Sequence, residues 1–377
     1  MAVTIEKLEC WVHRAPIATP LANAFAAMTN RPAVWVRVSA RDGSWGWGEV
    51  FSNFPTVGAE HRARLVSSIF SPLLEGTALQ NPAEMRSMLE KKTRIMAIQC
   101  GEPGPFAQII GGIDQALWDL SARRAGEPLW KHLGGTQPKV RIYASGLGPD
   151  RVAEMAAAKK AAGYRAFKLK VGFGGARNRD NLAELRQAVG RDATVMVDAN
   201  QAWSLEESIA RIEELMPYAP QWIEEPMAAD ESIQTWMKLY ERTKAPLAAG
   251  ENIRGEADFA AALDAGYLRF VQPDVGKWGG ITGCGAVARR AVARGIAFCP
   301  HWLAGGVGLA ASMHLLAAVG GAGFAEVDAN PNPLREEVFP MQVENGVVTL
   351  SSAPGLGVEP DLARLKPYAV SSGSSLK

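Results

Sequence analysis

The alternation of hydrophobic and polar residues changes near residue 135 and divides the chain into two parts. In the first part, residues 3–16 and 31–50 alternate as β-strands do, and Arg-Asp-Gly at 41–43 is typical of a turn between paired strands. Helical periodicity follows at about 61–70, at about 82–90, and over 111–135, where it ends in two glycines. This pattern predicts an α+β domain over 1–135.

Beyond residue 135, short apolar runs alternate with Ala-rich amphipathic stretches, which favours a closed parallel barrel of the (β/α)8 kind over 136–350. An open doubly wound sheet would need a Gly-rich phosphate turn, and Tyr-Ala-Ser-Gly-Leu-Gly-Pro-Asp at 143–150 is a poor version of one. We expect the tail, 351–377, to return to the first domain. The predicted strands are 140–144, 165–171, 194–198, 221–225, 246–251, 268–274, 296–301 and 323–328.

Composition narrows the class of protein. The 377 residues are 47% hydrophobic and 21% charged, and the formal net charge of +1 gives no general attraction to nucleic acid or anionic membranes. No apolar run could span a bilayer, and the first residues do not resemble a signal peptide. The four cysteines lack metal-binding or redox spacing, which indicates reduced, buried thiols. We therefore expect a cytoplasmic protein that binds neither nucleic acid nor a membrane.

Charged residues close the predicted barrel strands at regular intervals. From Asp198 onward they recur every 23 to 27 residues, about one strand, loop and helix, and scattered surface charges would not keep that spacing. The carboxyl ends of barrel strands face one mouth, where such barrels carry their active sites. We predict that the following residues meet there: Lys168, Lys170, Asp198, Glu224, Glu251, Asp274, His301 and Glu326.

Three of these carboxylates, Asp198, Glu224 and Glu251, come from neighbouring predicted strands. They would repel one another unless a cation lay between them. Oxygen ligands without cysteine or clustered histidine favour Mg²⁺ first and Mn²⁺ second, and disfavour zinc. The alternative is that they are solvated loop acids or helix caps, which their common position at strand ends argues against.

Lys168 and Lys170 are two residues apart, so on a strand their side chains point to the same face. Inside a barrel, nearby carboxylates could hold both ammonium groups. Lys168 and a metal ion would lower the pKa of Lys170 and make it a base near neutral pH. An edge strand with solvated lysines is the alternative.

His301 and Asp274 close adjacent predicted strands. A carboxylate orients an imidazole and raises its proton affinity, so the pair predicts a second acid/base. Glu326 is expected in the same ring, where an apolar environment would keep its carboxyl protonated and able to donate a hydrogen bond to an oxyanion.

With these residues in place, the sequence resembles the mandelate racemase subgroup of the enolase superfamily over nearly its whole length. The resemblance rests on residues 111–135 and on Lys-Leu-Lys, Val-Asp-Ala-Asn-Gln-Ala-Trp, Ile-Glu-Glu-Pro, Gly-Glu-Asn, Gln-Pro-Asp-Val-Gly-Lys-Trp-Gly-Gly-Ile-Thr-Gly and Pro-His-Trp, in that order. It implies a (β/α)7β barrel with a capping domain, and Mg²⁺ held by Asp198, Glu224 and Glu251.

The resemblance also implies residue roles. Lys170 is the implied base on one face of the substrate α-carbon, with Lys168 neutralising the substrate carboxylate. His301, paired with Asp274, is the implied acid/base on the other face, and Glu326 the donor that stabilises the enolate. Specificity is expected from cap loops near 16–30 and 50–58. Candidate substrate contacts are Lys168, Asn200, Lys277, Asn53 and Thr19.

Several functions use such a site. We favour dehydration of a sugar acid to a 2-keto-3-deoxy acid, because that activity is common in the subgroup. Racemisation or epimerisation of a 2-hydroxy acid or an amino-acid-like carboxylate is the alternative. Cycloisomerisation of a muconate-like substrate is ranked lower, because that branch is not associated with a His–Asp pair. The resemblance further implies a homo-oligomer, a dimer or an octamer.

Two hypotheses of other classes stay open at this stage. One is a non-catalytic binding protein on the same scaffold, against which the intact acids, bases and predicted metal ligands argue. The other is a phosphate-binding barrel, in which Ala-Gly-Gly-Val-Gly at 304–308 would hold an anion at a helix N-terminus. Close packing beside His301 is the other explanation for those glycines.

Overall fold

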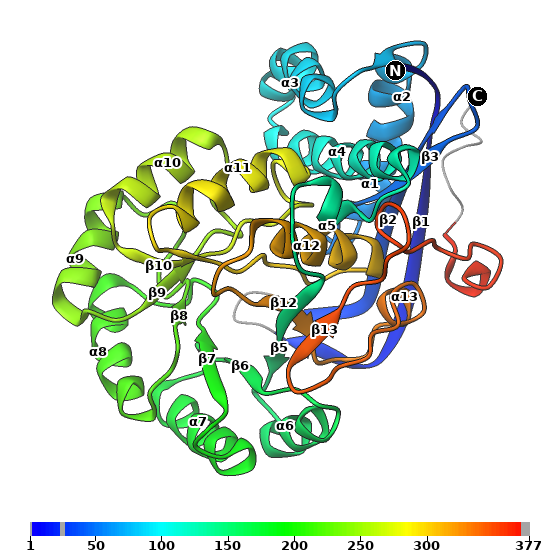
Figure 1. Ribbon diagram of the computed structural model, residues 1–377. Coiled ribbons are helices and arrows are strands. Elements are labelled where there is room, and N and C mark those ends of the chain that lie inside the picture. Colours follow the sequence, from blue (N-terminus) through cyan, green and yellow to red (C-terminus); the bar gives the residue numbers. More distant parts are fainter. Residues whose placement is uncertain (1, 23–26, 371–377) are drawn as a thin grey trace.

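The computed structural model describes residues 2–22 and 27–370 and contains two structural units, a cap and a barrel (Figure 1). The cap sheet has the order β3-β2-β1-β4, from β1 (Val3–Ala22), β2 (Ala27–Ala40), β3 (Trp45–Val50) and β4 (Ala78–Leu79). Strands β1, β2 and β3 pair antiparallel, and the turn predicted at 41–43 lies between β2 and β3.

The cap helices are α1 (Gly58–Leu65), which continues as a π-helical turn (Val66–Phe70), α2 (Ser71–Leu74), α3 (Pro82–Gln99), α4 (Pro103–Ala125) and α5 (Leu129–His132). Helices α1, α2 and α4 pack on the sheet, whereas α3 and α5 pack on α4. Helix α4 approaches β3 so closely that a Cβ atom on Gly48 would lie 1.9 Å from the Gly112 carbonyl oxygen. Only glycine permits this contact.

The barrel unit is a (β/α)7β arrangement, as the family resemblance implied. Eight parallel strands follow one another in the order β11-β10-β9-β8-β7-β6-β5-β12, and seven helices alternate with them on the outside (Figure 1). The strands are β5 (Lys139–Leu147), β6 (Ala166–Lys170), β7 (Thr194–Asp198), β8 (Ile223–Glu224), β9 (Leu247–Ala249), β10 (Leu268–Val271), β11 (Ala297–Phe298) and β12 (Ala325–Asp328).

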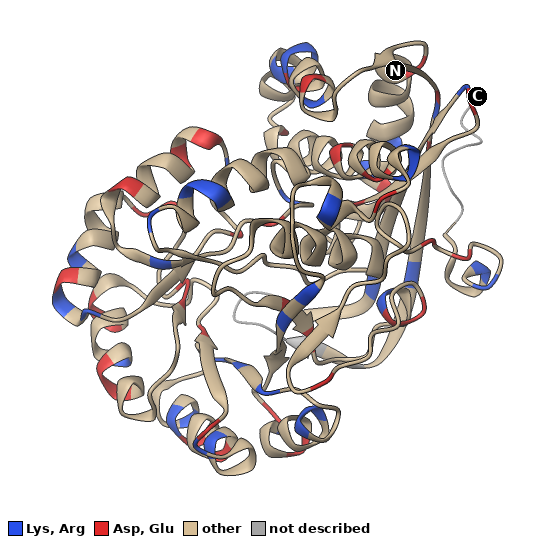
Figure 2. Ribbon diagram, viewed as in Figure 1, with Lys and Arg blue, Asp and Glu red and all other residues tan. Residues whose placement is uncertain are grey.

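The intervening helices are α6 (Val152–Ala161), α7 (Gly175–Val189), α8 (Leu205–Leu215), α9 (Ile233–Thr243), α10 (Glu256–Ala265), α11 (Gly280–Val292) and α12 (Gly306–Val319), with α13 (Pro333–Glu336) after the last barrel strand. Basic and acidic residues are intermixed along α7, α8 and α9 (Figure 2). No described helix is long and apolar enough to cross a membrane.

A layer of side chains fills the barrel lumen and forms the floor under its mouth. Seven successive strand segments each contribute one buried side chain to this cluster: Tyr143, Ala166, Met196, Trp222, Ala248, Phe270 and Cys299. Their rings pack edge to face or tilted, with Trp222 at 5.3 Å from Tyr143 and 5.0 Å from Phe270 between ring centroids. The lumen is therefore a packed core rather than a channel.

The chain beyond the barrel contacts both units. Strand β13 (Val347–Thr349) pairs antiparallel with β5. The backbone N–H of Leu129 donates to Gly355 O at 2.7 Å, and after a short 3₁₀ turn (Lys366–Tyr368) the N–H of Val370 donates to Val12 O at 2.9 Å.

Three expectations from the sequence differ from the structure. Most of the predicted loop 16–30 is strand, because β1 continues to Ala22 and β2 begins at Ala27, with a register shift between Pro16 and Leu21. Helix α3 continues to Gln99, well beyond residue 90. Only Cys284 and Cys299 are buried thiols, because Cys10 is half-buried and Cys100 is exposed.

Candidate active site

The strand register brings the predicted residues to one mouth. Lys170 pairs with Asp198 across β6 and β7, and Asp198 pairs with Glu224 across β7 and β8. Glu251, Asp274 and His301 follow β9, β10 and β11 within a few residues, and Glu326 lies in β12. Every one of these side chains faces the inside of the barrel mouth or its floor, as the contacts below show.

Lys168 lies beneath the mouth and is fully buried. Its ammonium group is 2.6 Å from Glu224 Oε1, 2.8 Å from Glu326 Oε1 and 3.5 Å from Asp198 Oδ2. It also lies 5.3 Å from the centroid of the Tyr143 ring in the lumen layer. The predicted direct contact between Lys168 and a substrate is therefore not supported by its position, because carboxylates enclose its charge.

Lys170 is two residues further along β6 and reaches the mouth. Its Nζ lies 2.6 Å from Asp198 Oδ2. The other oxygen of Asp198 accepts a hydrogen bond from the backbone N–H of Asn200 at 2.8 Å. Asp198 thus holds the ammonium group of Lys170 at a fixed place on the wall of the mouth.

His301 lies between two carboxylates and is almost completely buried. Its Nδ1 is 2.5 Å from Asp274 Oδ2, and its Nε2 is 2.5 Å from Glu251 Oε2. Asp274 is oriented in turn by the backbone N–H groups of Gly276 and Lys277, at 2.7 and 2.9 Å from its Oδ1. The predicted His–Asp pair is present, and Glu251 completes a line of three side chains.

The charges of the mouth control the proton affinity of His301. Burial lowers its pKa. The negative charges of Glu251 and Glu326 and the contact with Asp274 outweigh this effect and raise the pKa to about 10. At neutral pH the protein groups alone therefore hold a charged imidazolium that is able to donate a proton.

Two pKa expectations are not met by the protein groups. Burial lowers the pKa of Lys170, but attraction to Asp198 outweighs this and leaves the pKa raised rather than depressed. Burial raises the pKa of Glu326, but Lys168 and His301 lower it overall, so Glu326 is ionised and accepts the hydroxyl of Ser145 at 2.5 Å. The protein groups therefore do not favour a protonated Glu326, because a buried lysine lies beside it.

On the acidic side of the mouth, neighbouring cations do not fully balance the negative charge of the carboxylates. Burial and the charge of Asp198 raise the pKa of Glu224 to about 7, and burial and the charge of Glu251 raise that of Glu225 to about 8. Two buried oxygens there, Asn200 Oδ1 and Glu225 Oε1, have no hydrogen-bond partner. Such an excess of oxygen donors fits a hard divalent cation.

In their present positions these donors do not form a coordination sphere. Among the described residues, no three carboxyl, imidazole or thiol groups are placed to hold one metal ion. Ammonium groups occupy the oxygens instead: Lys168 contacts Glu224, Lys170 contacts Asp198, and Lys277 lies 3.2 Å from Glu251 Oε1. A bound cation would have to displace these contacts.

Strained backbone is concentrated at the same strand ends. Asn200, Gln201 and Glu225 have φ of 46°, 65° and 37°, in the left-handed region that residues with a Cβ atom seldom adopt. Such conformations persist where surrounding contacts impose them, and they cluster at functional sites.

A cavity of about 590 Å³ opens above the charged residues and is lined by Lys170, Asn200, Glu251, Lys277 and His301. Three of the candidate substrate contacts, Asn53, Asn200 and Lys277, thus line the same space as both predicted acid/base groups. This size accommodates a small organic acid.

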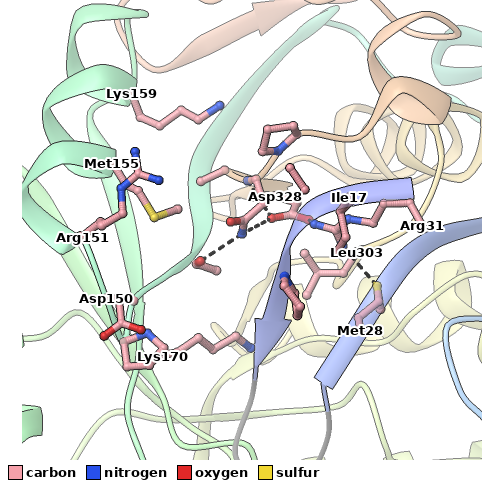
Figure 3. Close-up of a pocket in the computed structure, with 18 of the residues that line it drawn as sticks. Ile17, Met28, Arg31, Asp150, Arg151, Met155, Lys159, Lys170, Leu303 and Asp328 are labelled. Atoms are coloured by element: carbon pink, nitrogen blue, oxygen red, sulfur yellow. Dashed lines mark hydrogen bonds and ion pairs between the residues drawn. The ribbon is translucent and has the colours of Figure 1, made fainter. Parts of the chain in front are cut away.

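A second space of about 690 Å³ adjoins this cavity and shares Asn53, Phe54, Lys170 and Leu303 with it. Strands β1 and β2 of the cap contribute Ile17, Met28 and Arg31 to its wall, and the barrel contributes Lys170 and Asp328 (Figure 3).

The structure describes the side chain of only one of the two candidate substrate contacts in the cap. Asn53 donates its side-chain N–H to Leu303 O at 2.7 Å, beside both cavities. Thr19 lies in β1, but its side chain is outside the described part of the structure.

Sequence reasoning did not predict the contacts of three side chains in this region. Ser145 lies near the end of β5 and contacts Glu326. It lies 25 residues before Lys170, so the spacing used for the other strands would have found it. Arg31 and Asp328 form a buried ion pair between cap and barrel. Their separation of 297 residues left no local pattern to indicate it.

The phosphate-binding hypothesis for 304–308 is not supported. The N–H groups of Gly305 and Gly308 already donate to the Glu49 carboxylate of the cap, at 2.6 and 2.9 Å. A protein carboxylate therefore takes the place that an anion would need.

Comparison with known proteins adds independent evidence. Residues 7–134 match the N-terminal domain of the mandelate racemase / muconate lactonizing enzyme family, and residues 150–364 match the enolase C-terminal domain-like family. A crystal structure of mandelate racemase/muconate lactonizing enzyme from Bordetella bronchiseptica RB50 is 47% identical, with a TM-score of 0.93 over 98% of this chain and 100% of that one. A racemase from Streptomyces coelicolor A3(2) with bound magnesium is 30% identical, with a TM-score of 0.87 over 97% and 100%.

Two curated relatives of the chain have different activities. D-galactarolactone cycloisomerase of Agrobacterium fabrum is 30% identical over 95% of this chain and 96% of its own length. D-galactonate dehydratase of Ralstonia pickettii is 34% identical over 75% of this chain and 74% of its own length.

Proposed function

Because the chain belongs to the mandelate racemase / muconate lactonizing enzyme family of the enolase superfamily, we propose that it removes the proton α to the carboxylate of a sugar acid and expels the β-hydroxyl as water. The product is a 2-keto-3-deoxy acid. The observation that supports this most strongly is that Lys170 and His301 line one cavity from different sides of the barrel mouth. They lie on β6 and beyond β11, which are separated by at least two strands in either direction.

Lys170 is the proposed base. Its ammonium group lies 2.6 Å from Asp198, which favours the protonated form of Lys170. Lys170 can accept a substrate proton only when it is neutral, so Asp198 must first be drawn to another cation. We assign Asp198, Glu224 and Glu251 as the residues that would hold Mg²⁺, with Mn²⁺ as a substitute. The bound ion would polarise the substrate carboxylate and stabilise the dianionic enolate.

His301 is the proposed acid. With a pKa of about 10 it is charged at neutral pH and oriented by Asp274. Lys170 takes the proton from C2, the C2–C3 double bond forms, and the C3–O bond breaks as His301 gives its proton to the departing hydroxyl. The resulting enol rearranges to the 2-keto acid, so that the reaction removes one water overall.

The test is incubation of the purified protein with Mg²⁺ and a panel of sugar acids and 2-hydroxy acids in D₂O, followed by proton NMR and mass spectrometry. A product one water lighter, with deuterium at C3, supports dehydration. Deuterium at C2 with formation of the other stereoisomer would instead identify a racemase or epimerase.

A second candidate is cycloisomerisation of a sugar lactone, which the nearly full-length similarity to D-galactarolactone cycloisomerase favours. The same base could remove the α-proton while a ring oxygen, rather than a hydroxyl, leaves the β-carbon. The mass of the product separates the two, because cycloisomerisation leaves it unchanged. Lactones therefore belong in the panel.

Asn200, Lys277 and Asn53 are proposed to contact the substrate, since they line the cavity beside Lys170. Assembly into a homo-oligomer also stays a proposal, which light scattering at several protein concentrations tests directly.

A further inference from the structure

A buried carboxylate of the cap is bonded to the loop that carries His301. Glu49 lies in β3, is completely buried, and belongs to the cap sheet through its pairing with Trp35 of β2. Its two oxygens accept the N–H groups of Gly305 and Gly308, at the start of α12. A Cβ atom on Gly305 would lie 2.4 Å from Glu49 Oε1, so β3 and the segment before α12 are in tight contact.

The contact continues to the catalytic residues through Trp302, which directly follows His301. The indole N–H of Trp302 donates to Gly305 O at 2.8 Å, and its backbone N–H donates to Glu326 Oε2 at 3.2 Å. A Cβ atom on Gly308 would lie only 2.0 Å from the Trp302 ring. Glu49 therefore fixes a loop that has little room to shift without moving His301.

The partner of His301 is tied to the same place. Gln115 of α4 accepts the backbone N–H of Glu49 at 3.2 Å and donates both to Glu49 O and to Val275 O, each at 3.0 Å. Val275 directly follows Asp274. One position in the cap thus contacts the loop of His301 and, through one amide, the loop of Asp274.

We propose that Glu49 is a positioning residue for the acid/base His301: it sets the place of the imidazole in the mouth through the loop at 302–308. This proposal rests on the proposed function, in which Lys170 removes the C2 proton and His301 protonates the departing C3 hydroxyl. Displacing a catalytic group by about 1 Å costs on the order of 100-fold in rate. Lys170 lies on β6 and has no such tie to Glu49, so the effect should be confined to the step that needs His301.

Asp119 provides a matched control. It is also a fully buried carboxylate at the cap, and it accepts the N–H groups of Trp47 and Leu356. It joins β3 and α4 to the C-terminal segment instead of to a catalytic loop. A general loss of cap stability would therefore follow from changes at either residue, whereas a positional effect on His301 would follow only from changes at Glu49.

The experiment compares Glu49→Gln with Asp119→Asn. In Glu49→Gln, one of the two N–H groups loses its acceptor, because the amide NH₂ cannot accept. With a substrate acid in D₂O, we expect loss of water, the step that needs His301, to fall about 10- to 100-fold. Exchange of the C2 proton by Lys170 should change less than about threefold. Equal losses in both measurements, no loss, or the same pattern in Asp119→Asn would overturn the proposal.

A second readout does not need a substrate. The chain has five histidines, and the imidazole NMR signals of His301 can be assigned by their loss in His301→Asn. We expect those signals to move in Glu49→Gln and to stay in Asp119→Asn; unmoved signals refute the proposal even if no acid is turned over. Should Glu49→Gln not fold, Glu49→Asp keeps the charge, shortens its reach, and is expected to give the same pattern.

Discussion

Nε2 of His301 lies 2.5 Å from Oε2 of Glu251, so the proposed acid and a proposed metal ligand share a hydrogen bond. Burial raises the pKa of Glu251, but His301 and Lys277 lower it well below its ordinary value. A cation that binds Glu251 competes with the imidazole for the same carboxylate. The charge state of His301 and metal binding are therefore linked.

Replacement of Glu251 by Gln should weaken Mg²⁺ binding at least about tenfold, or about 1.4 kcal/mol, because a charged oxygen ligand is lost. Isothermal titration calorimetry with Mg²⁺ measures this. Glu206→Gln on the outer face of α8 is the control and should bind like the parent protein. An unchanged affinity in Glu251→Gln would refute the ligand assignment.

Lys170→Ala should abolish proton removal from one configuration at C2, with a loss of at least about 100-fold, since a positioned general base contributes about 10²- to 10⁴-fold. Exchange of the C2 proton with D₂O is the measurement. Lys159→Ala on α6 lines only the larger space and leaves both proposed acid/base groups intact. If Lys170→Ala kept full turnover, Lys170 would have no part in the reaction.

His301→Asn should stop dehydration, because no acid is left for the departing hydroxyl. Exchange at C2 by Lys170 should continue on its own face, slower by no more than about tenfold. The same D₂O experiment, read before and after product formation, separates the two steps. Loss of all exchange together with retained folding would mean that the two roles are wrongly assigned.

The alternating pattern and the spacing of about 25 residues were enough to predict the barrel and the position of its charged strand ends. They also predicted that Lys168 and Lys170 share a face. They could not predict depth: a residue two positions earlier on a strand lies about 6.6 Å lower, which places Lys168 against the lumen layer and Lys170 in the mouth. The ionisation of Glu326 depended on that difference.

The cap was harder to predict because its relevant contacts are long-range. Pro16 and Pro20 are typical of a loop, yet pairing with β2 continues the strand through this region to Ala22. Glu49 lies 256 residues from Gly305, and no local pattern marks a carboxylate that will occupy a distant helix N-terminus.

The buried pair Arg31–Asp328 gives a prediction for stability. Both side chains are about 95% buried. Asp328→Asn would leave the Arg31 charge without its main partner, at a cost of about 3–5 kcal/mol in the free energy of unfolding. Urea denaturation measures it, and Glu154→Gln in the exposed pair with Arg151 should have little effect. A small change in Asp328→Asn would mean that Arg31 finds another partner.

His314 gives a prediction for acid stability. Burial lowers its pKa to about 3, although a hydrogen bond to Leu356 O partly opposes this. Between about pH 6.5 and 3 the unfolded chain binds a proton that the folded chain does not. The free energy of unfolding therefore falls on acidification, by about 1.4 kcal/mol per pH unit from this residue.

The backbone N–H of Trp130 donates to His314 Nδ1 at 2.9 Å. The variant His314→Asn keeps an acceptor for this N–H group. Its urea midpoint should decrease less steeply between pH 6.5 and 4 than that of the parent protein, and with the same slope above pH 7. Identical slopes below pH 6.5 would show that His314 does not titrate in this way.

The return of the chain to Val12 has a consequence for solubility. Strand β1 lies next to β4 only at Val3 and Thr4, and further along its free side His13 is bridged by Ala369 and Val12 by Val370. The last described residues thus cover hydrogen-bonding groups that another chain could otherwise pair with. A protein shortened before Ala369 would expose an extended sheet edge, the kind of surface from which intermolecular β-aggregation begins.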